Sequence, residues 1–165
     1  ARRAVRMSRP ERDSIDLDSS STGYLLGRGG ATKERLANFT GCRLEIGHSK
    51  VELIGSREAI DLAQLCVRIT LQQRTQKVER DLDVRYSDLE DRDDVETLDV
   101  ETEAVGFLLG AKGATLRQME EKHRVFMFFD NERVRTGRAG APAKRLYVIG
   151  SRRDREGVLD ECREA

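Results

Sequence analysis

The chain has 165 residues, with 30 lysines and arginines against 30 aspartates and glutamates, so it carries no net charge that would attract a polyanion over its whole surface. Its three cysteines have no CxxC spacing, and no apolar run reaches the length of a membrane span. These features argue against zinc, a disulfide framework and a membrane protein. We therefore expect a soluble intracellular protein, of the cytoplasm or nucleus, with neither cofactor nor metal. Because the chain begins with Ala1, we also expect it to be part of a longer protein.

Residues 1–11 form a basic tail, and six elements are predicted in order over residues 12–76. "SIDLD" alternates as a half-buried strand does, and the serines after it and Thr22 are candidate N-caps for a short helix that ends at Leu26. "ATKERLANFT" predicts a second helix, with Gly41 as its left-handed C-cap. "CRLEI" and "KVELI" predict two strands, and Ser56 caps a third helix that has an apolar stripe.

Residues 77–93 follow as an acidic segment without glycine or proline. The pattern leaves two structures open, an extension of the preceding helix and an extra strand. We treat the segment as a linker.

The same order of elements is predicted again over residues 94–165. One set of glycines recurs at a constant offset of 83, in which Gly23, Gly27 and Gly30 match Gly106, Gly110 and Gly113. Later the offset is 95, because "LIGSR" matches "VIGSR", so the second copy has 12 extra residues, which lie in the loop 131–144. We expect the arginines of the last helix, Arg152, Arg153 and Arg155, to be exposed. The repeat indicates two copies of one module.

These segments resemble type I K-homology (KH) domains, whose pattern is an alternating strand, a glycine, two aliphatic residues and GXXG, then a helix, "TG" and a second strand. The first copy matches at Ile15, Leu17, Gly23, Leu25, Leu26, Gly27, Gly30, Leu36, Thr40, Gly41, Leu44 and Ile46. The second matches at Val100, Val105, Gly106, Leu108, Leu109, Gly110, Gly113, Leu116, Met119, Phe126 and Phe128. The resemblance implies an α+β fold of two KH domains, each a three-stranded antiparallel sheet packed against three helices.

The resemblance also implies that single-stranded nucleic acid binds at two loops, where bare backbone and helix amides would face the phosphates. The loops are Gly27, Arg28, Gly29 and Gly30 in the first copy and Gly110, Ala111, Lys112 and Gly113 in the second. Bases would lie in an apolar groove. Its residues carry over onto Leu26, Leu36 and Leu44 in the first copy and Leu109, Leu116 and Phe126 in the second. Arg43 would read a base edge.

The two copies depart from the family pattern at a few positions. Lys33 replaces an aliphatic residue that the second copy keeps as Leu116, and it either reaches a phosphate or spoils the floor of the groove. The second copy has Lys122 and His123 in place of "TG", and Val125 stands where the first copy has Arg43.

The long loop of the second copy carries Arg133, Arg135 and Arg138, which would fold over a bound strand or form a solvated loop. Tyr24 and Phe107 precede the paired leucines of the two copies, either as surface rings near the ligand or as packing residues.

We expect the partner to be single-stranded RNA, with single-stranded DNA as the alternative, other proteins as further partners, and no small-molecule substrate. The rival interpretation is a degenerate KH pair that acts as a protein-interaction scaffold. An enzyme is disfavoured: "GFLLGAKGA" resembles a phosphate-binding P-loop, but Ala111 stands at its second glycine and Gly113 at its Ser or Thr. "GRGGAT" lacks the third glycine of a dinucleotide fingerprint, since Thr32 occupies that place.

Overall fold

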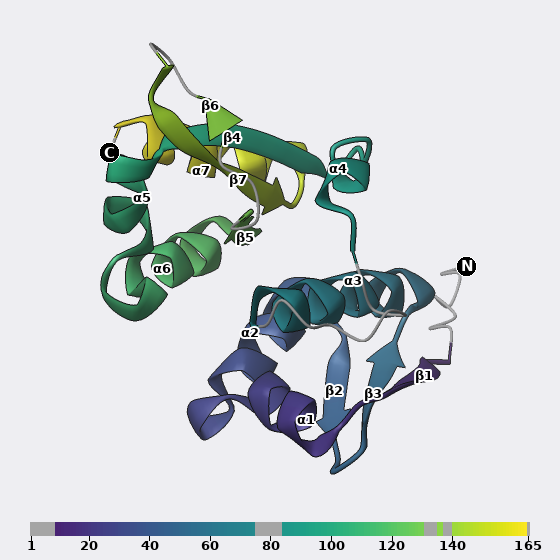
Figure 1. Cartoon of the computed structure of the whole chain (residues 1–165). Coiled ribbons are helices and arrows are strands. Elements are labelled where there is room, and N and C mark those ends of the chain that lie inside the picture. Colours follow the sequence, from purple (N-terminus) through teal and green to yellow (C-terminus); the bar gives the residue numbers. More distant parts are fainter. Residues whose placement is uncertain (1–8, 75–83, 131–134, 137–139, 165) are drawn as a thin grey trace, which may run out of the picture. The chain divides into compact units, whose positions relative to one another are not determined.

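The computed structural model describes residues 9–74, 84–130, 135–136 and 140–164 (Figure 1). The chain divides into two compact units, residues 1–84 and 85–165. Each unit combines helices with an antiparallel sheet, which confirms the α+β fold predicted from the repeat.

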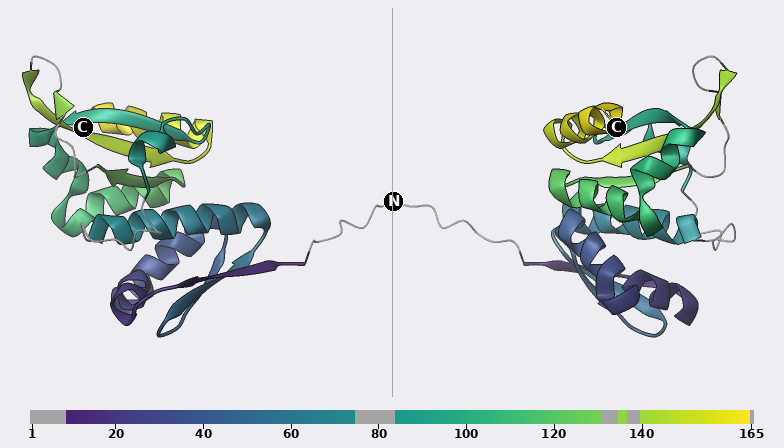
Figure 2. Two further views of the ribbon diagram at one scale, coloured as in Figure 1. Left: turned by 45° about the vertical axis from the view of Figure 1, so that its right-hand side comes forward. Right: turned by 90° about the vertical axis from the view of Figure 1, so that its left-hand side faces the viewer.

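The first unit follows the predicted order of elements. These are β1 (Glu11–Asp16), α1 (Ser19–Leu26), a short 3-10 turn (Arg28–Gly30), α2 (Ala31–Thr40), β2 (Arg43–Ile46), β3 (Lys50–Gly55) and α3 (Arg57–Arg74). The strands lie in the order β1-β3-β2, so β2 is an edge strand. In β2 and β3, Leu44, Val51 and Leu53 are buried, and α3 lies against this sheet (Figure 2).

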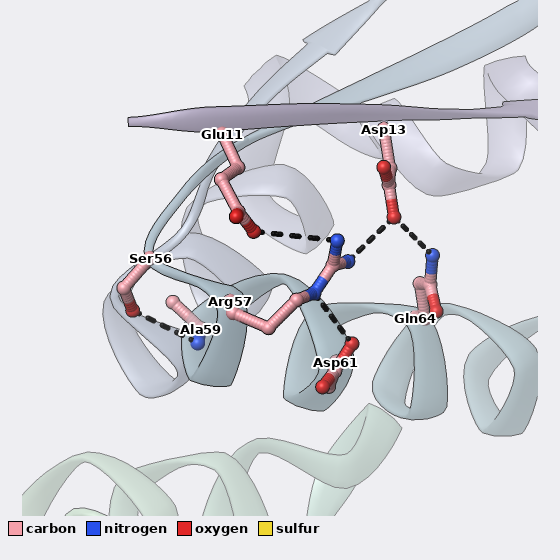
Figure 3. Close-up of polar contacts among 7 residues, drawn as sticks. All are labelled: Glu11, Asp13, Ser56, Arg57, Ala59, Asp61 and Gln64. Carbon is pink, nitrogen blue, oxygen red and sulfur yellow. Dashed lines mark hydrogen bonds and ion pairs between the residues drawn. The ribbon is translucent and has the colours of Figure 1, made fainter. Parts of the chain in front are cut away.

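The first turn of α3 is tied to β1 by a group of polar contacts around Arg57 (Figure 3). Its guanidinium pairs with Asp13 at 2.5 Å, Glu11 at 3.3 Å and Asp61 at 3.1 Å. The hydrogen bond to Asp13 is the main reason that the pKa of Arg57 is raised. Ser56 caps the helix as predicted, because its Oγ accepts the Ala59 amide at 3.1 Å.

The second unit repeats this order with additions. Its elements are α4 (Tyr86–Leu89), β4 (Val95–Glu101), α5 (Thr102–Leu109), a 3-10 turn (Ala111–Gly113), α6 (Ala114–His123), β5 (Phe126–Phe129), β6 (Arg135–Thr136), β7 (Pro142–Ile149) and α7 (Arg152–Glu164). The order is β4-β7-β5, and the short β6 pairs with the start of β7. Val158 and Leu159 of α7 belong to the same buried core as Leu146 and Val148 of β7. The helix α7 lies over one face of this sheet (Figure 2).

Part of the segment predicted as a linker belongs to the second unit. Tyr86 of α4 packs on the sheet, with its ring 5.1 Å from the ring of Phe128 and 5.7 Å from that of Tyr147. Glu90, directly after α4, accepts hydrogen bonds from the Tyr147 hydroxyl at 3.2 Å and from Arg145 at 2.5 Å. Residues 86–90 therefore form a cover on the sheet face opposite the helical core. Residues 75–83 lie outside the described part of the chain.

The prediction that all three arginines of α7 are exposed is wrong for Arg155. Its guanidinium is buried, where it donates to Glu96 at 3.0 Å and to the carbonyl oxygens of Asp93 and Gly150 at 2.9 and 2.8 Å. These three acceptors stabilise a buried charge and link the start of α7 to β4. Arg152 and Arg153 are exposed.

All three cysteines are buried free thiols. In the described residues no helix has the length and hydropathy needed to cross a membrane. Nor does this part of the chain contain a group of three His, Cys, Asp or Glu side chains that could hold a metal ion.

Candidate nucleic-acid interface

The first GXXG loop is a sharp left-handed turn between two helices. The helix α1 is capped by Asp18, whose side chain accepts the Ser21 amide at 2.7 Å and thereby has a lowered pKa. The helix ends at Gly27, with φ of 72°, and the chain then passes through Gly29 at 63° and Gly30 at 80° before α2 begins. No side chain caps α2, so the amides of its first turn have no side-chain acceptor there.

The second loop has the same backbone shape. Gly110 and Gly113 have φ values of 70° and 77°, and no side chain caps α6. Lys112 lies between them with φ of 54°, a conformation that costs a non-glycine residue about 1–2 kcal/mol. The chain therefore holds a cation in a strained position at this turn.

The glycines of the loops serve two purposes. A Cβ atom at Gly27 would lie 2.9 Å from the amide nitrogen of Thr32, and one at Gly110 would lie 2.9 Å from that of Thr115. The first glycine of each loop is thus required by the packing of the loop on itself. In contrast, a Cβ at Gly29, Gly30 or Gly113 would meet nothing within 4 Å, so these glycines supply positive φ and leave bare backbone at the surface.

Three cations accompany these turns. Arg28 and Lys112 are exposed and Lys33 is half-buried, and none of them pairs with a carboxylate in the described residues. Arg28 is the first x residue of its loop and Lys112 the second of its own, so the two charges project from different positions of the turn. Arg43 differs, because it is engaged with Glu45 at 2.7 Å.

The aliphatic residues predicted to line a groove are mostly buried. Leu36, Leu44 and Leu116 lie in the cores of their units, where they support the surface from beneath. Leu26 is 44% exposed, and Leu109 is partly buried. These two residues, directly before the loops, are therefore the accessible part of the predicted apolar lining.

The predicted alignment of the second copy is wrong by one residue at β5. Phe126 pairs with Ile149 as Arg43 pairs with Ile54, so Phe126 corresponds to Arg43 and not to Leu44. The residues that face the helical core are Met127 and Phe129, whereas Phe126 lies on the other face, 6.1 Å from the ring of Phe128. Phe126 is therefore not part of the apolar lining.

The cause of this shift lies at the end of α6. Arg124 adopts φ of 57° and takes the C-cap position that Gly41 fills in the first unit, so His123 and Arg124 replace "TG". Arginine gives no sequence signal for a left-handed cap. Four consecutive apolar residues in "FMFF" also give no alternation that would set the strand register.

Aromatic rings precede both loops at equivalent positions. Arg74 lies over the ring of Tyr24, 5.0 Å from its centroid, and donates to the Ser20 carbonyl at 2.7 Å. Phe107 is 83% exposed. Of the three arginines predicted in the long loop, Arg135 is the first residue of β6. Arg133 and Arg138 lie outside the described residues.

Glu120 is not among the residues that the sequence pattern predicts, yet it lies on α6, the helix after the second loop, and contacts the strand β5. It is only 6% exposed, and its carboxylate accepts the Met127 amide at 2.7 Å and Arg117 Nη1 at 2.8 Å. The sequence signal that could have found it is the difference between the two copies at this position, where the first copy has Ala37 and the second has Glu120.

A repeated helix, glycine turn and helix beside an edge strand defines a class of single-stranded nucleic-acid-binding module. The chain belongs to the KH domain family, whose profile matches residues 12–68 and 95–161. None of the curated proteins compared with the chain matches it significantly.

Several archaeal structures are similar to this chain. A chain of the a/eIF2alpha, aDim2p and rRNA complex from Pyrococcus horikoshii is 15% identical, with 93% of this chain and 83% of that one covered and a TM-score of 0.35. Dim2p from the same organism is 14% identical, with 92% and 88% covered and a TM-score of 0.35. A protein of unknown function from Aeropyrum pernix is 17% identical, with 93% and 80% covered and a TM-score of 0.33.

Proposed function

We propose that this chain binds single-stranded RNA, without catalysis, by seating its sugar-phosphate backbone on the loops Gly27–Gly30 and Gly110–Gly113. One observation carries the proposal: each unit presents a left-handed turn of bare backbone, directly before an uncapped helix, with a cation that has no carboxylate partner among the described residues. KH modules bind single strands through this loop.

The chemistry of the interface is mainly electrostatic. The first-turn amides of α2 and α6 lie at the positive end of their helix dipoles, which favours a phosphate. Arg28, Lys33 and Lys112 add charge without reading sequence. Since the chain has no net charge, attraction depends on local basic segments such as these loops, and the affinity falls as salt is raised.

The test is binding of a randomised single-stranded RNA pool, measured by fluorescence anisotropy at low salt. Two variants place acids in the loops: Arg28→Asp with Gly29→Asp, and Ala111→Asp with Lys112→Asp. We expect each to weaken binding by at least about tenfold, because an acid opposes the phosphate at close range. Aspartate tolerates the left-handed backbone of the second position.

A matched control is Arg152→Asp with Arg153→Asp, which also adds negative charge at exposed positions, but at the start of α7. It should bind as the wild type does, and a matched single-stranded DNA pool shows whether RNA is preferred. Absence of binding by the wild-type chain at low salt would refute the proposal and favour a protein-interaction scaffold.

A further inference from the structure

The strands β2 and β5 end their sheets, so half of their peptide groups have no strand partner. In an antiparallel pair, successive residues point their N–H and C=O groups alternately toward the neighbouring strand and away from it. The outward groups of an edge strand are free to pair with another molecule. In both units this edge lies beside the helix that follows the GXXG loop.

In the second unit the outward amide of Met127 is already occupied. It donates to Glu120 Oε2 at 2.7 Å, and Arg117 holds the other carboxylate oxygen at 2.8 Å. The carboxylate is nearly enclosed, with the residue 6% exposed. A base that approached Met127 would have to displace this bound anion from the Met127 amide.

The first unit lacks such a side chain at the corresponding place. Both helices have ten residues and begin at equivalent alanines, so Glu120 corresponds to Ala37. The matching strand registers make Leu44 the counterpart of Met127, with its amide directed to the same edge. Ala37 has only a methyl group as its side chain, so it cannot accept a hydrogen bond from the Leu44 amide.

We propose that Glu120 takes the place of a base acceptor on β5, so that the second unit contributes phosphate contacts while the first unit reads bases at the edge of β2. The inference rests on the proposed function and assigns different tasks to two loops of the same backbone shape. The buried carboxylate acts in two ways, because it fills the hydrogen-bonding position and repels acceptor atoms and phosphates.

The test exchanges the two residues. The wild-type chain, Glu120→Ala, Glu120→Gln and Ala37→Glu are compared for affinity and base preference with a randomised single-stranded RNA pool and its most enriched oligonucleotide. Glu120→Ala opens the edge of β5 and should strengthen binding about tenfold and add base preference, since one good base contact accounts for about that factor. Glu120→Gln keeps an oxygen for the Met127 amide but removes the negative charge, so its binding should lie between that of the wild type and that of Glu120→Ala.

Ala37→Glu places the same side chain in the first unit and should weaken binding of the enriched oligonucleotide about tenfold, while the salt-dependent binding of the unselected pool is retained. This variant also keeps the inference testable if Glu120→Ala fails to fold, which circular dichroism would show. The inference would be overturned, and the proposed function kept, by either of two results. One is that Glu120→Ala binds RNA no more tightly than the wild type does, and the other is that Ala37→Glu binds the enriched oligonucleotide as tightly as the wild type does. No RNA binding by any of these folded proteins would overturn the proposed function.

Discussion

At the scale of single residues, a few backbone positions with positive φ determine where the chain turns and where its helices end. Most of them are glycines, and they fix the turns that the sequence predicts. Lys112 and Arg124 adopt the same conformation with full side chains. The two cases differ in their consequence: Lys112 presents a charge at the second loop, whereas Arg124 only ends a helix.

Replacing Arg124 by glycine should stabilise the second unit. The free energy of unfolding should rise by about 1 kcal/mol, because glycine relieves the left-handed strain and loses part of that gain through its greater freedom in the unfolded chain. Urea unfolding followed by circular dichroism measures the change. Gly41→Ala at the matched cap of α2 should lower stability instead, and equal stability of Arg124→Gly and wild type would show that the cap carries no strain.

Some residues of the candidate site can be predicted from the sequence and others cannot. The glycines and the cations of the loops are predictable because a repeat at a fixed offset exposes them. Glu120 is not, since its role depends on which amide of β5 points outward, and this in turn depends on a register hidden by Arg124 and "FMFF". Arg155 is also not predictable, because two of its three acceptors, Glu96 and the Asp93 carbonyl, lie 59 and 62 residues earlier in the chain.

At the scale of elements, periodicity and caps predict both copies of the module, whereas α4 follows from tertiary packing. A helix of four residues has little stability of its own. It is held by Tyr86, whose ring contacts Phe128 and Tyr147. The first unit has no such cover in its described residues: the same face of its sheet carries Arg12, Glu45 and Glu52, which form ion pairs at the surface.

Tyr86→Ala should therefore destabilise the second unit. We expect a loss of about 3 kcal/mol, as for other large-to-small substitutions of a buried ring. Thermal and urea unfolding measure the loss, with Tyr86→Phe as the variant that keeps the ring. If both variants unfold like the wild type, α4 does not contribute to the stability of the sheet.

The contact between α6 and α7 should make stability depend on pH. Glu161 accepts hydrogen bonds from His123 and from Lys122, the latter at 3.2 Å, and these two partners lower its pKa, His123 having the larger effect. A carboxyl group whose pKa is depressed in the folded state stabilises above its unfolded pKa of about 4.3, and this contribution is lost as pH falls through the lower folded value.

The difference in unfolding free energy between wild type and Glu161→Gln should thus be fully present above about pH 4.3 and shrink as the pH falls below it. Urea unfolding at a series of pH values measures it. A difference that is constant from neutral to acidic pH would mean that the carboxylate charge is not coupled to folding.

At the scale of the whole molecule, the repeat predicts two units because one set of signals occurs twice, and the fold repeats accordingly. Balanced charge means that the chain has no general basic surface, so we expect binding to depend on local basic segments. Two weak sites that engage one strand can gain about 100- to 10,000-fold in avidity. A second unit that contacts only the phosphates would then still increase the affinity of the whole chain for RNA.

The clash that a methyl group would make with Thr32 or Thr115 has a wider meaning for duplicated modules of this kind. The leading glycine must persist for the turn to fold at all, even in a copy that has lost its ligand during divergence. Its persistence therefore reports intact architecture, while the residues that project outward from the same turn record whether recognition survives.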